Sequence, residues 1–274
     1  MTATSEGIGR VLPLTLGWEH LPKTVSVLGA DPSVRLREPV PAVLCEVEDG
    51  WILLDCGFNT PTVRDLALRR RFHGDDHIVP ELPAATEPDV DPLIAAFALV
   101  GVDPADVVAV ALSHLHTDHV GGLRHFAGLV PVHIQRAELD HGFGEHPGPE
   151  RQGILRIDFD DPHIDWRLAD GPVDIAPGLR AVPTVGHTPG HQSFVVSLAA
   201  GDGFIFAFDA ADLTENLDDE VSVGALYGGT AQDSVAAIRR LKAFAAETGY
   251  RLVPGHDPVA WPALCADLGV PTFT

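Results

Sequence analysis

Residues 113–122 read Ser113-His114-Leu115-His116-Thr117-Asp118-His119-Val120-Gly121-Gly122, directly after the apolar run from Val107 to Leu112. Side chains alternate along an extended chain, so His114 and His116 project to the same side and can reach one metal ion. The adjacent pair Asp118-His119 must diverge, which suits a second ion nearby. Four candidate ligands at the end of an apolar strand predict a metal site rather than a solvated surface run.

Three further candidate ligands follow other strand-like runs. Each is placed after a short apolar segment, where the chain leaves a predicted sheet: His187 after Leu179 to Val182, Asp209 at the end of Phe204 to Phe208, and His256 after Arg251 to Val253. An unpaired carboxylate at the end of a buried strand is costly unless a cation meets it. Asp209 is therefore expected to contact metal.

Glycines beside these ligands have predicted backbone roles. Gly121-Gly122 is expected to turn the chain sharply into a helix, and Gly255 to allow close approach of the backbone before His256. Pro189-Gly190 fits the central pair of a type II turn. His191 has two open interpretations: a group that orients this turn, or a hydrogen-bonded core histidine.

The seven candidates divide into two sets around two ions. His114, His116 and His187 make one set, Asp118, His119 and His256 the other, and Asp209 bridges them. Room for a shared solvent oxygen remains, which is typical of a catalytic site. Two divalent ions against two carboxylates and one hydroxide leave a net charge of about +1, which attracts a carbonyl oxygen. Zinc is the expected metal, and His/Asp sets also accept iron, cobalt or manganese.

Length and charge limit the alternatives. The chain has 274 residues, which predicts a single domain over 1–274. Its formal net charge of -21 disfavours nucleic acid as a partner. No apolar run approaches the ~20 residues that cross a bilayer, so no membrane partner is expected. The sequence does not fix the oligomeric state, and a homodimer is one open alternative.

Cysteines and the N-terminal region bear on location. Met1 to Gly9 carries no basic cluster, and the apolar stretch Val11 to Leu16 is broken by Pro13, so no leader is readable. Three cysteines, an odd count, predict reduced thiols. A cytoplasmic location is the resulting prediction.

The remaining pattern predicts strands in groups with helices interspersed, which indicates sheets covered by helices on their outer faces. The expected strands are 42–47 and 51–55, joined by a hairpin turn at Glu48-Asp49-Gly50, then 107–112, 132–134, 179–182, 193–198, 204–208 and 251–253. The expected helices are 59–70, 91–100 with a stop at Gly101, 123–126, 136–141 and 231–247. Residues 71–90 are irregular, and we expect either a lid over the substrate, with Phe72 and Ile78 as apolar walls, or a plain surface loop.

The string from His114 to His119 resembles the His-x-His-x-Asp-His hallmark of the metallo-β-lactamase superfamily. More narrowly, the chain resembles the N-acyl-homoserine-lactone lactonase branch, through Trp51 to Gly57, Ser113 to Gly122, Gly186 to Ser193, Asp209-Ala210 and Gly255 to Asp257. The resemblance implies an α/β fold, the four-layer αββα sandwich, with a dinuclear site at one edge of the paired sheets and the same metal ligands.

Two positions depart from the lactonase pattern. Lactonases commonly carry a tyrosine three residues after the bridging aspartate, where this chain has Asp212. They often have an aromatic residue where this chain has Thr117. A second carboxylate repels an oxyanion, so the substrate is expected to be a small lactone or ester that differs from an acyl-homoserine lactone.

The predicted activity is hydrolysis of that lactone or ester by a dinuclear metal site. A metal-bridging hydroxide attacks the acyl carbon, and Asp118 passes the proton from nucleophile to leaving group. Two other reactions stay open: a thioester hydrolase of the hydroxyacylglutathione type, and a mononuclear-iron persulfide dioxygenase. The first is disfavoured because only Arg239, Arg240, Lys242 and Arg251 are basic after Asp209.

Overall fold

Two β-sheets form the centre of the protein. The computed structural model describes residues 7–73, 77–84, 90–144 and 153–273. The larger sheet has seven strands in the order β4 (Val79–Glu81), β1 (Val11–Pro22), β2 (Arg35–Val47), β3 (Gly50–Leu54), β5 (Val107–Ala111), β6 (Pro131–Gln135), β7 (Asp165–Ala169). The smaller has five, in the order β12 (Arg251–Val253), β11 (Gly203–Phe206), β10 (Gln192–Ser197), β9 (Leu179–Pro183), β8 (Val173–Ala176).

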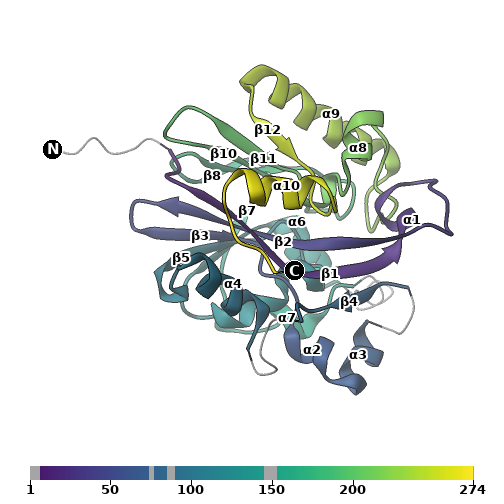
Figure 1. Ribbon diagram of the computed structural model, residues 1–274, viewed down its shortest axis with the longest axis horizontal. Coiled ribbons are helices and arrows are strands. Elements are labelled where there is room, and N and C mark those ends of the chain that lie inside the picture. The colour runs from purple at the N-terminus through teal and green to yellow at the C-terminus, as the bar shows by residue number, and fades with distance from the viewer. Residues whose placement is uncertain (1–6, 74–76, 85–89, 145–152, 274) are drawn as a thin grey trace.

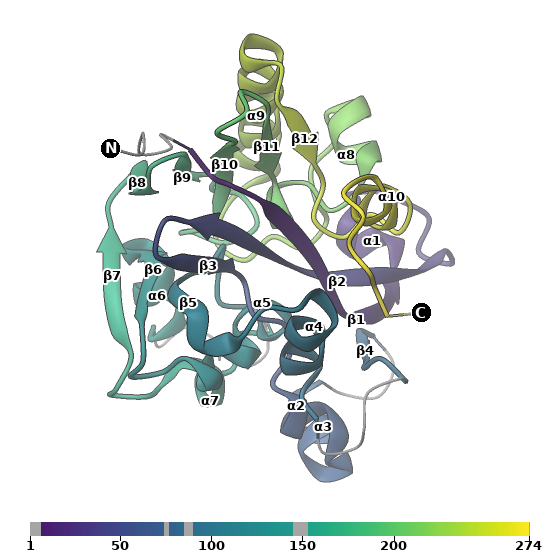
Figure 2. The same ribbon diagram turned by 60° about the vertical axis from the view of Figure 1, so that its left-hand side comes forward.

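Helices cover the outer faces of both sheets (Figures 1 and 2). The described helices are α1 (Lys23–Ser26), α2 (Thr60–Arg64), α3 (Leu66–Phe72), α4 (Pro92–Val100), α5 (Thr117–Val120), α6 (Arg136–Gly142), α7 (Arg156–Phe159), α8 (Thr214–Asp219), α9 (Ala231–Thr248) and α10 (Ala260–Asp267). Figure 2 shows α4 and α7 on the side of the seven-stranded sheet and α9 on the side of the five-stranded sheet. The predicted αββα sandwich is confirmed. None of the described helices is both long and apolar enough to cross a membrane.

Buried side chains fill the space between the sheets. Val43 and Ile52 of the larger sheet belong to one apolar cluster with Phe194 and Phe206 of the smaller. Separate clusters lie beneath the outer helices, one of them packing Ile238 of α9 against the five-stranded sheet. Cys45, Cys56 and Cys265 are buried free thiols, as the odd count predicted.

Most predicted elements are present, with several local differences. The helix expected over 123–126 is a 3-10 helix over Gly121–His125. The helix expected over 59–70 is interrupted at Asp65, whose extended backbone lets its carboxylate accept from the amides of Ala67 and Leu68 and begin α3. The strand expected over 204–208 ends at Phe206, because Ala207 has a helical backbone, φ -70° and ψ -31°, and precedes the 3-10 turn Phe208–Ala210. The run at 11–16 is part of a strand, β1. At Pro13, β1 pairs with β2 on one side, and no described strand pairs with it on the other. The missing N–H of Pro13 therefore costs little.

The segment 71–90 contains structure that the sequence did not indicate. It begins in the last turn of α3 and includes β4, which pairs with β1 through Glu81 opposite Trp18. Residues 74–76 and 85–89 of this segment lie outside the described residues.

Candidate metal centre

The seven predicted ligands meet where strands of both sheets end. His114 and His116 lie in the loop after β5, and Asp118 and His119 in α5 that follows. His187 comes after β9, Asp209 lies in the 3-10 turn after β11, and His256 follows β12. All seven are at most 7% exposed. Parallel strands end at the same edge of a sheet, so the loops that follow them bring together residues that are far apart in the sequence.

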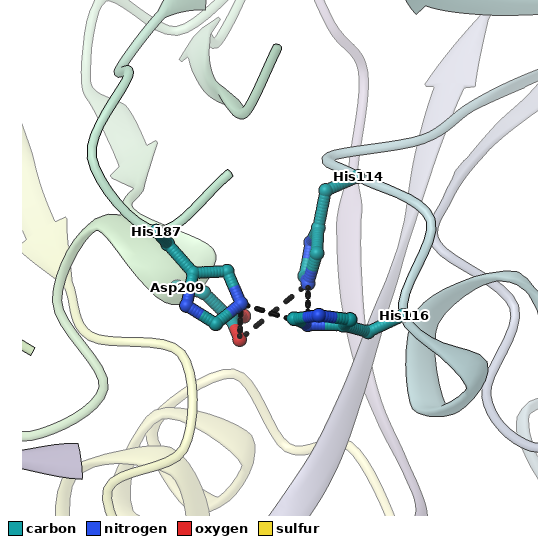
Figure 3. Close-up of side chains that lie close together, drawn as sticks. All are labelled: His114, His116, His187 and Asp209. Carbon is teal, nitrogen blue, oxygen red and sulfur yellow. Dashed lines mark hydrogen bonds and ion pairs between the residues drawn. The ribbon is translucent and has the colours of Figure 1, made fainter. Parts of the chain in front are cut away.

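The first set is formed by three histidines and one aspartate oxygen (Figure 3). His116 Nδ1 lies 2.8 Å from His114 Nε2 and 2.8 Å from His187 Nε2. Asp209 Oδ2 lies 3.6 Å from His114 Nε2 and 3.3 Å from His187 Nε2. These separations bracket the ~3.4 Å between neighbouring ligands of a tetrahedral ion held at about 2.0–2.1 Å.

The second set uses the other oxygen of the same aspartate. Asp209 Oδ1 lies 3.1 Å from His119 Nε2 and 3.1 Å from His256 Nε2. Asp118 Oδ2 lies 3.0 Å from His119 Nε2 and 4.0 Å from His256 Nε2. Because each oxygen of Asp209 faces one set, this carboxylate is positioned to bridge two ions.

Hydrogen bonding alone does not account for this cluster. An imidazole nitrogen has a single in-plane lone pair or a single proton, yet His116 Nδ1 faces two other ring nitrogens at once. His119 Nε2 is buried, and although carboxylate oxygens of Asp118 and Asp209 lie 3.0 Å and 3.1 Å away, no contact of this nitrogen with a described residue has hydrogen-bond geometry. A metal ion satisfies both atoms, so the donor set fits divalent metal.

The outer nitrogens of three candidate ligands, His114, His187 and His256, are held by acceptors. His187 Nδ1 lies 2.8 Å from the carbonyl of Ala225, and His256 Nδ1 lies 3.0 Å from that of Pro39. His114 Nδ1 lies 2.9 Å from the Ser113 hydroxyl. Such contacts fix the ring orientation and aim Nε2 at the ion.

Asp55 is the buried acceptor that the sequence reasoning did not single out. Its Oδ2 lies 2.7 Å from His119 Nδ1 and accepts the Ser113 hydroxyl at 2.7 Å, while its Oδ1 accepts the Ser113 amide at 2.7 Å. It has a φ of 57° and no exposed surface. One carboxylate therefore orients His119 directly and His114 through Ser113.

Glu138 joins the two ligand-bearing loops and was also missed. Its carboxylate accepts the amide of Leu115 at 3.1 Å and the amide of Gly190 at 3.0 Å. Burial raises the pKa of Glu138 to about 7. No local pattern marks Glu138, because its partners lie 23 and 52 residues away.

The electrostatics favour neutral imidazoles in the first set. Burial, and then the neighbouring histidines, lower the pKa values of His114 and His116 well below the ordinary value. Burial by itself raises the pKa of Asp209, but the histidines around it, His119 foremost, hold it well below the ordinary value. Neutral histidines and an ionised carboxylate are the forms that bind metal.

Three predictions about the flanking residues need correction or refinement. Gly190 does not have the positive φ of a type II turn, and a Cβ there would lie 2.1 Å from the Glu138 amide nitrogen. Gly121 is required in the same way, since its Cβ would lie 1.9 Å from the nitrogen of Asn59. His191 lies outside both sets and its Nδ1 contacts the Thr184 hydroxyl at 2.8 Å. Close approach of other backbone segments, rather than turn geometry, explains the glycines at 121 and 190. The close backbone approach predicted at Gly255 is confirmed.

A cavity of about 270 Å³ opens beside the two sets. Its apolar lining includes Phe72 and Ile78, the two residues predicted as walls, together with Leu21 and Tyr227. The Tyr227 ring lies edge-on to His116, with centroids 5.2 Å apart. Tyr227 was not predicted, because it comes from the segment between α8 and α9, far from every ligand in sequence.

The cavity also contains carboxylates beyond the ligands. Glu19, Glu38 and Asp212 line it beside Asp118 and Asp209. Burial raises the pKa of Glu38 to about 7 and those of Glu19 and Asp212 well above the ordinary values. Asp212 was noted in the sequence as a departure from the lactonase pattern, whereas Glu19 and Glu38 were not singled out.

Comparison with known families agrees with this geometry. The model of the metallo-beta-lactamase superfamily matches residues 35–256, a span that contains all seven candidate ligands. The chain belongs to the metallo-β-lactamase superfamily. The four-layer sandwich is the fold of a member of this superfamily.

Individual relatives within the superfamily carry lactonase names. The N-acyl homoserine lactonase AttM of Azorhizobium caulinodans is 35% identical over 179 residues, 62% of this chain and 65% of that protein. The chain thus spans just under two thirds of that relative's length. The N-acyl homoserine lactonase AiiA of Bacillus thuringiensis subsp. kurstaki is 28% identical over 226 residues, 82% of this chain and 84% of that protein.

A solved superfamily structure matches almost the whole chain. It is an N-acyl homoserine lactone hydrolase with the product N-hexanoyl-L-homoserine bound at its catalytic metal center. The TM-score is 0.78 at 27% identity, covering 92% of this chain and 94% of that one.

Proposed function

We propose that this protein is a dinuclear metal-dependent hydrolase that opens a lactone or cleaves an ester. The observation that carries this proposal is Asp209, whose two oxygens face two separate ligand sets. The lactonase names of the relatives support a lactone as the first substrate class to test.

The seven residues would hold two divalent ions, with zinc the expected metal and iron, cobalt or manganese compatible with the donors. Two such ions would polarise the acyl carbonyl and lower the pKa of a bridging water to about 7, so that hydroxide is available as nucleophile. Asp55 and Glu138 keep the ligand loops in place for this chemistry through the hydrogen bonds described above.

Two cavity residues have roles at the reacting atoms. Asp118 lies at the cavity wall and passes the proton from the attacking water to the leaving oxygen. The hydroxyl of Tyr227, which lines the same cavity, donates a hydrogen bond to the substrate carbonyl as its oxygen gains charge. Tyr227 would thereby supply a donor that Asp212 does not.

The cavity lining disfavours the thioesterase alternative. Glutathione carries carboxylates that a binding site meets with cations, yet the described residues that line this cavity include no lysine or arginine. Two ligand sets likewise favour two ions over the single iron of a persulfide dioxygenase.

The test combines metal analysis with a substrate screen. The purified protein, loaded with zinc, is analysed for bound metal and assayed on N-acyl homoserine lactones, aryl esters and thioesters. We expect two ions per chain, hydrolysis of a lactone or ester, and loss of both metal and turnover in Asp209→Ala. Full activity after complete chelation, or turnover with one ion per chain, contradicts the proposal.

A further inference from the structure

Three carboxylates outside the ligand sets gather on one wall of the cavity. Glu19 of β1 and Glu38 of β2 are direct partners in the antiparallel register of these strands. Asp212, two residues beyond the turn that carries Asp209, lies beside them and lines the same cavity. Glu38 is 1% exposed and Asp212 is 5% exposed. We call these three residues the acidic wall.

The acidic wall adjoins the second ligand set. His256 Nδ1 contacts the carbonyl of Pro39, the residue after Glu38, and the His256 amide donates to the carbonyl of Asp212 at 2.8 Å. Side-chain ligand atoms of Asp212, Asp209 and His256 all lie within 4.8 Å of one another. A group bound at the acidic wall is therefore next to the reacting atoms.

Ionisation of all three carboxylates is unfavourable unless a cation binds there. Like charges directly opposite on neighbouring strands repel each other, and burial favours the neutral form of each group. The described cations closest in sequence are engaged elsewhere: Arg37 pairs with Glu81, and Lys23 pairs with Glu215. Ser26 donates its hydroxyl to Glu38 at 2.6 Å. That neutral contact does not balance a charge.

Asp212 supplies an independent sign of a missing ligand. Its Oδ1 is buried and has no hydrogen-bond partner among the described residues, although the side chain borders the cavity. An unpaired buried acceptor destabilises the folded state. A donor that enters through the cavity removes this cost.

The metal ions do not require the acidic wall. Two divalent ions with Asp118 and Asp209 carry a charge of about +2, and full ionisation of the acidic wall would change it to about −1. An excess of negative charge excludes a substrate that bears a carboxylate or phosphate and favours one with a positive charge. An ammonium group has three N–H donors and so can serve three carboxylates at once.

We propose that Glu19, Glu38 and Asp212 form an ammonium-binding subsite, and that the natural substrate is a lactone or ester that carries a protonated amine. This inference rests on the proposed hydrolase function and specifies its substrate class. The amine is held at the acidic wall while the acyl carbon lies at the metal centre. Charge-assisted hydrogen bonds of this kind are about twice as strong as neutral ones.

The decisive experiment uses two lactones of equal chain length. One is N-glycyl homoserine lactone, whose short acyl chain ends in a protonated amine close to the lactone ring, and the other is N-propionyl homoserine lactone, which ends in a methyl group. With the zinc-loaded protein, we expect kcat/KM to be at least about tenfold higher for the amine-ended lactone. The difference is expected mainly in KM, because the amine takes no part in the bonds that form and break.

Substitutions in the acidic wall test whether it causes the preference for the amine-ended lactone. In Glu38→Gln and in the more exposed Glu19→Gln, the ratio of the two kcat/KM values is expected to fall toward one. Glu48→Gln is the matched control, since it removes the same charge from the exposed β2–β3 turn and should keep the ratio. Thermal unfolding of each variant shows whether it folds.

A binding measurement separates this inference from the proposed function. Calorimetry on the zinc-loaded protein compares a primary alkylamine with the alcohol of equal length. We expect the amine to bind more tightly in the wild-type protein and to lose that advantage in Glu19→Gln. If neither lactone is hydrolysed but this preference is found, the proposed function fails and the ammonium subsite stands.

Three results would overturn the inference while leaving a hydrolase intact. The first is equal kcat/KM for the methyl-ended and the amine-ended lactone. The second is that Glu19→Gln and Glu38→Gln both fold and keep the wild-type ratio. The third is a third metal ion per chain that is lost in Asp212→Asn, which would make the acidic wall a metal site instead.

Discussion

Two groups of buried carboxylates surround the metal centre, and they differ in what their oxygens contact. Asp55 and Glu138 accept hydrogen bonds from amides of the ligand loops, and Asp55 also from a ligand ring. In the acidic wall, Glu38 has one hydroxyl donor, and the Asp212 Oδ1 has no hydrogen-bond partner in the part of the chain that the structure describes. Asp55 and Glu138, whose donors are in place, stabilise the ligand loops. We infer that the carboxylates of the acidic wall, which lack such donors, contact a ligand instead.

Of the changes considered, removal of the Asp55 carboxylate should have the largest effect, on both stability and metal affinity. In Asp55→Ala, the Ser113 amide and the ring of His119 lose their acceptor, so we expect a loss of about 2–4 kcal/mol in unfolding free energy. Metal affinity should fall about 10–100-fold. Zinc titration and urea unfolding measure the two effects. Asp55→Asn, which tolerates the positive φ and keeps one acceptor, should lose less; equal losses would contradict the assigned role.

Tyr227 lines the cavity, and its hydroxyl is the hydrogen-bond donor that we propose for the substrate carbonyl. Tyr227→Phe removes only the hydroxyl, so we expect kcat/KM for a lactone to fall about 10–100-fold with unchanged zinc content. Tyr250→Phe is the control, because the Tyr250 hydroxyl donates to Ser197 at 2.9 Å away from the cavity. Equal rates in wild type and Tyr227→Phe would remove Tyr227 from the mechanism.

Glu138 predicts a pH dependence of stability. Its pKa is raised from 4.5 to about 7 by burial, so the folded state binds this proton more tightly than the unfolded chain does. The contribution is therefore complete below about pH 4.5 and is lost as the pH rises through about 7. Urea unfolding of the metal-free protein across this range should show a smaller decline in Glu138→Gln than in wild type. Parallel curves would show that Glu138 does not titrate this way.

The smallest effect is expected at a carboxylate that is paired but not buried. Glu46 forms an ion pair with Arg10 at 2.7 Å, and the Arg10 side chain is 63% exposed. Solvent screens such pairs, so Glu46→Gln should change the unfolding free energy by less than about 1 kcal/mol and leave turnover unchanged. A larger loss would mean that burial is not what distinguishes the carboxylate groups.

Local signals were sufficient for the ligands and for most elements of the sandwich. Each ligand follows a short apolar run, and Gly101, at φ 73°, ends α4 where the sequence indicated. One local signal was misread, because Asp65 begins a new helix inside an expected one. The strand β1 was not predicted, and Pro13 lies within it where no second described strand pairs with β1.

By itself the sequence determined the seven candidate ligands, their grouping into two sets and, through family resemblance, the αββα layers. Their spacing is local, since four lie within six residues and the others directly follow strands. Only the tertiary structure decided that Glu19 lies opposite Glu38, that Tyr227 borders the cavity, and that Glu138 joins two ligand loops. These contacts join segments that are distant in sequence, so strand register and loop packing create them, and no local pattern encodes either.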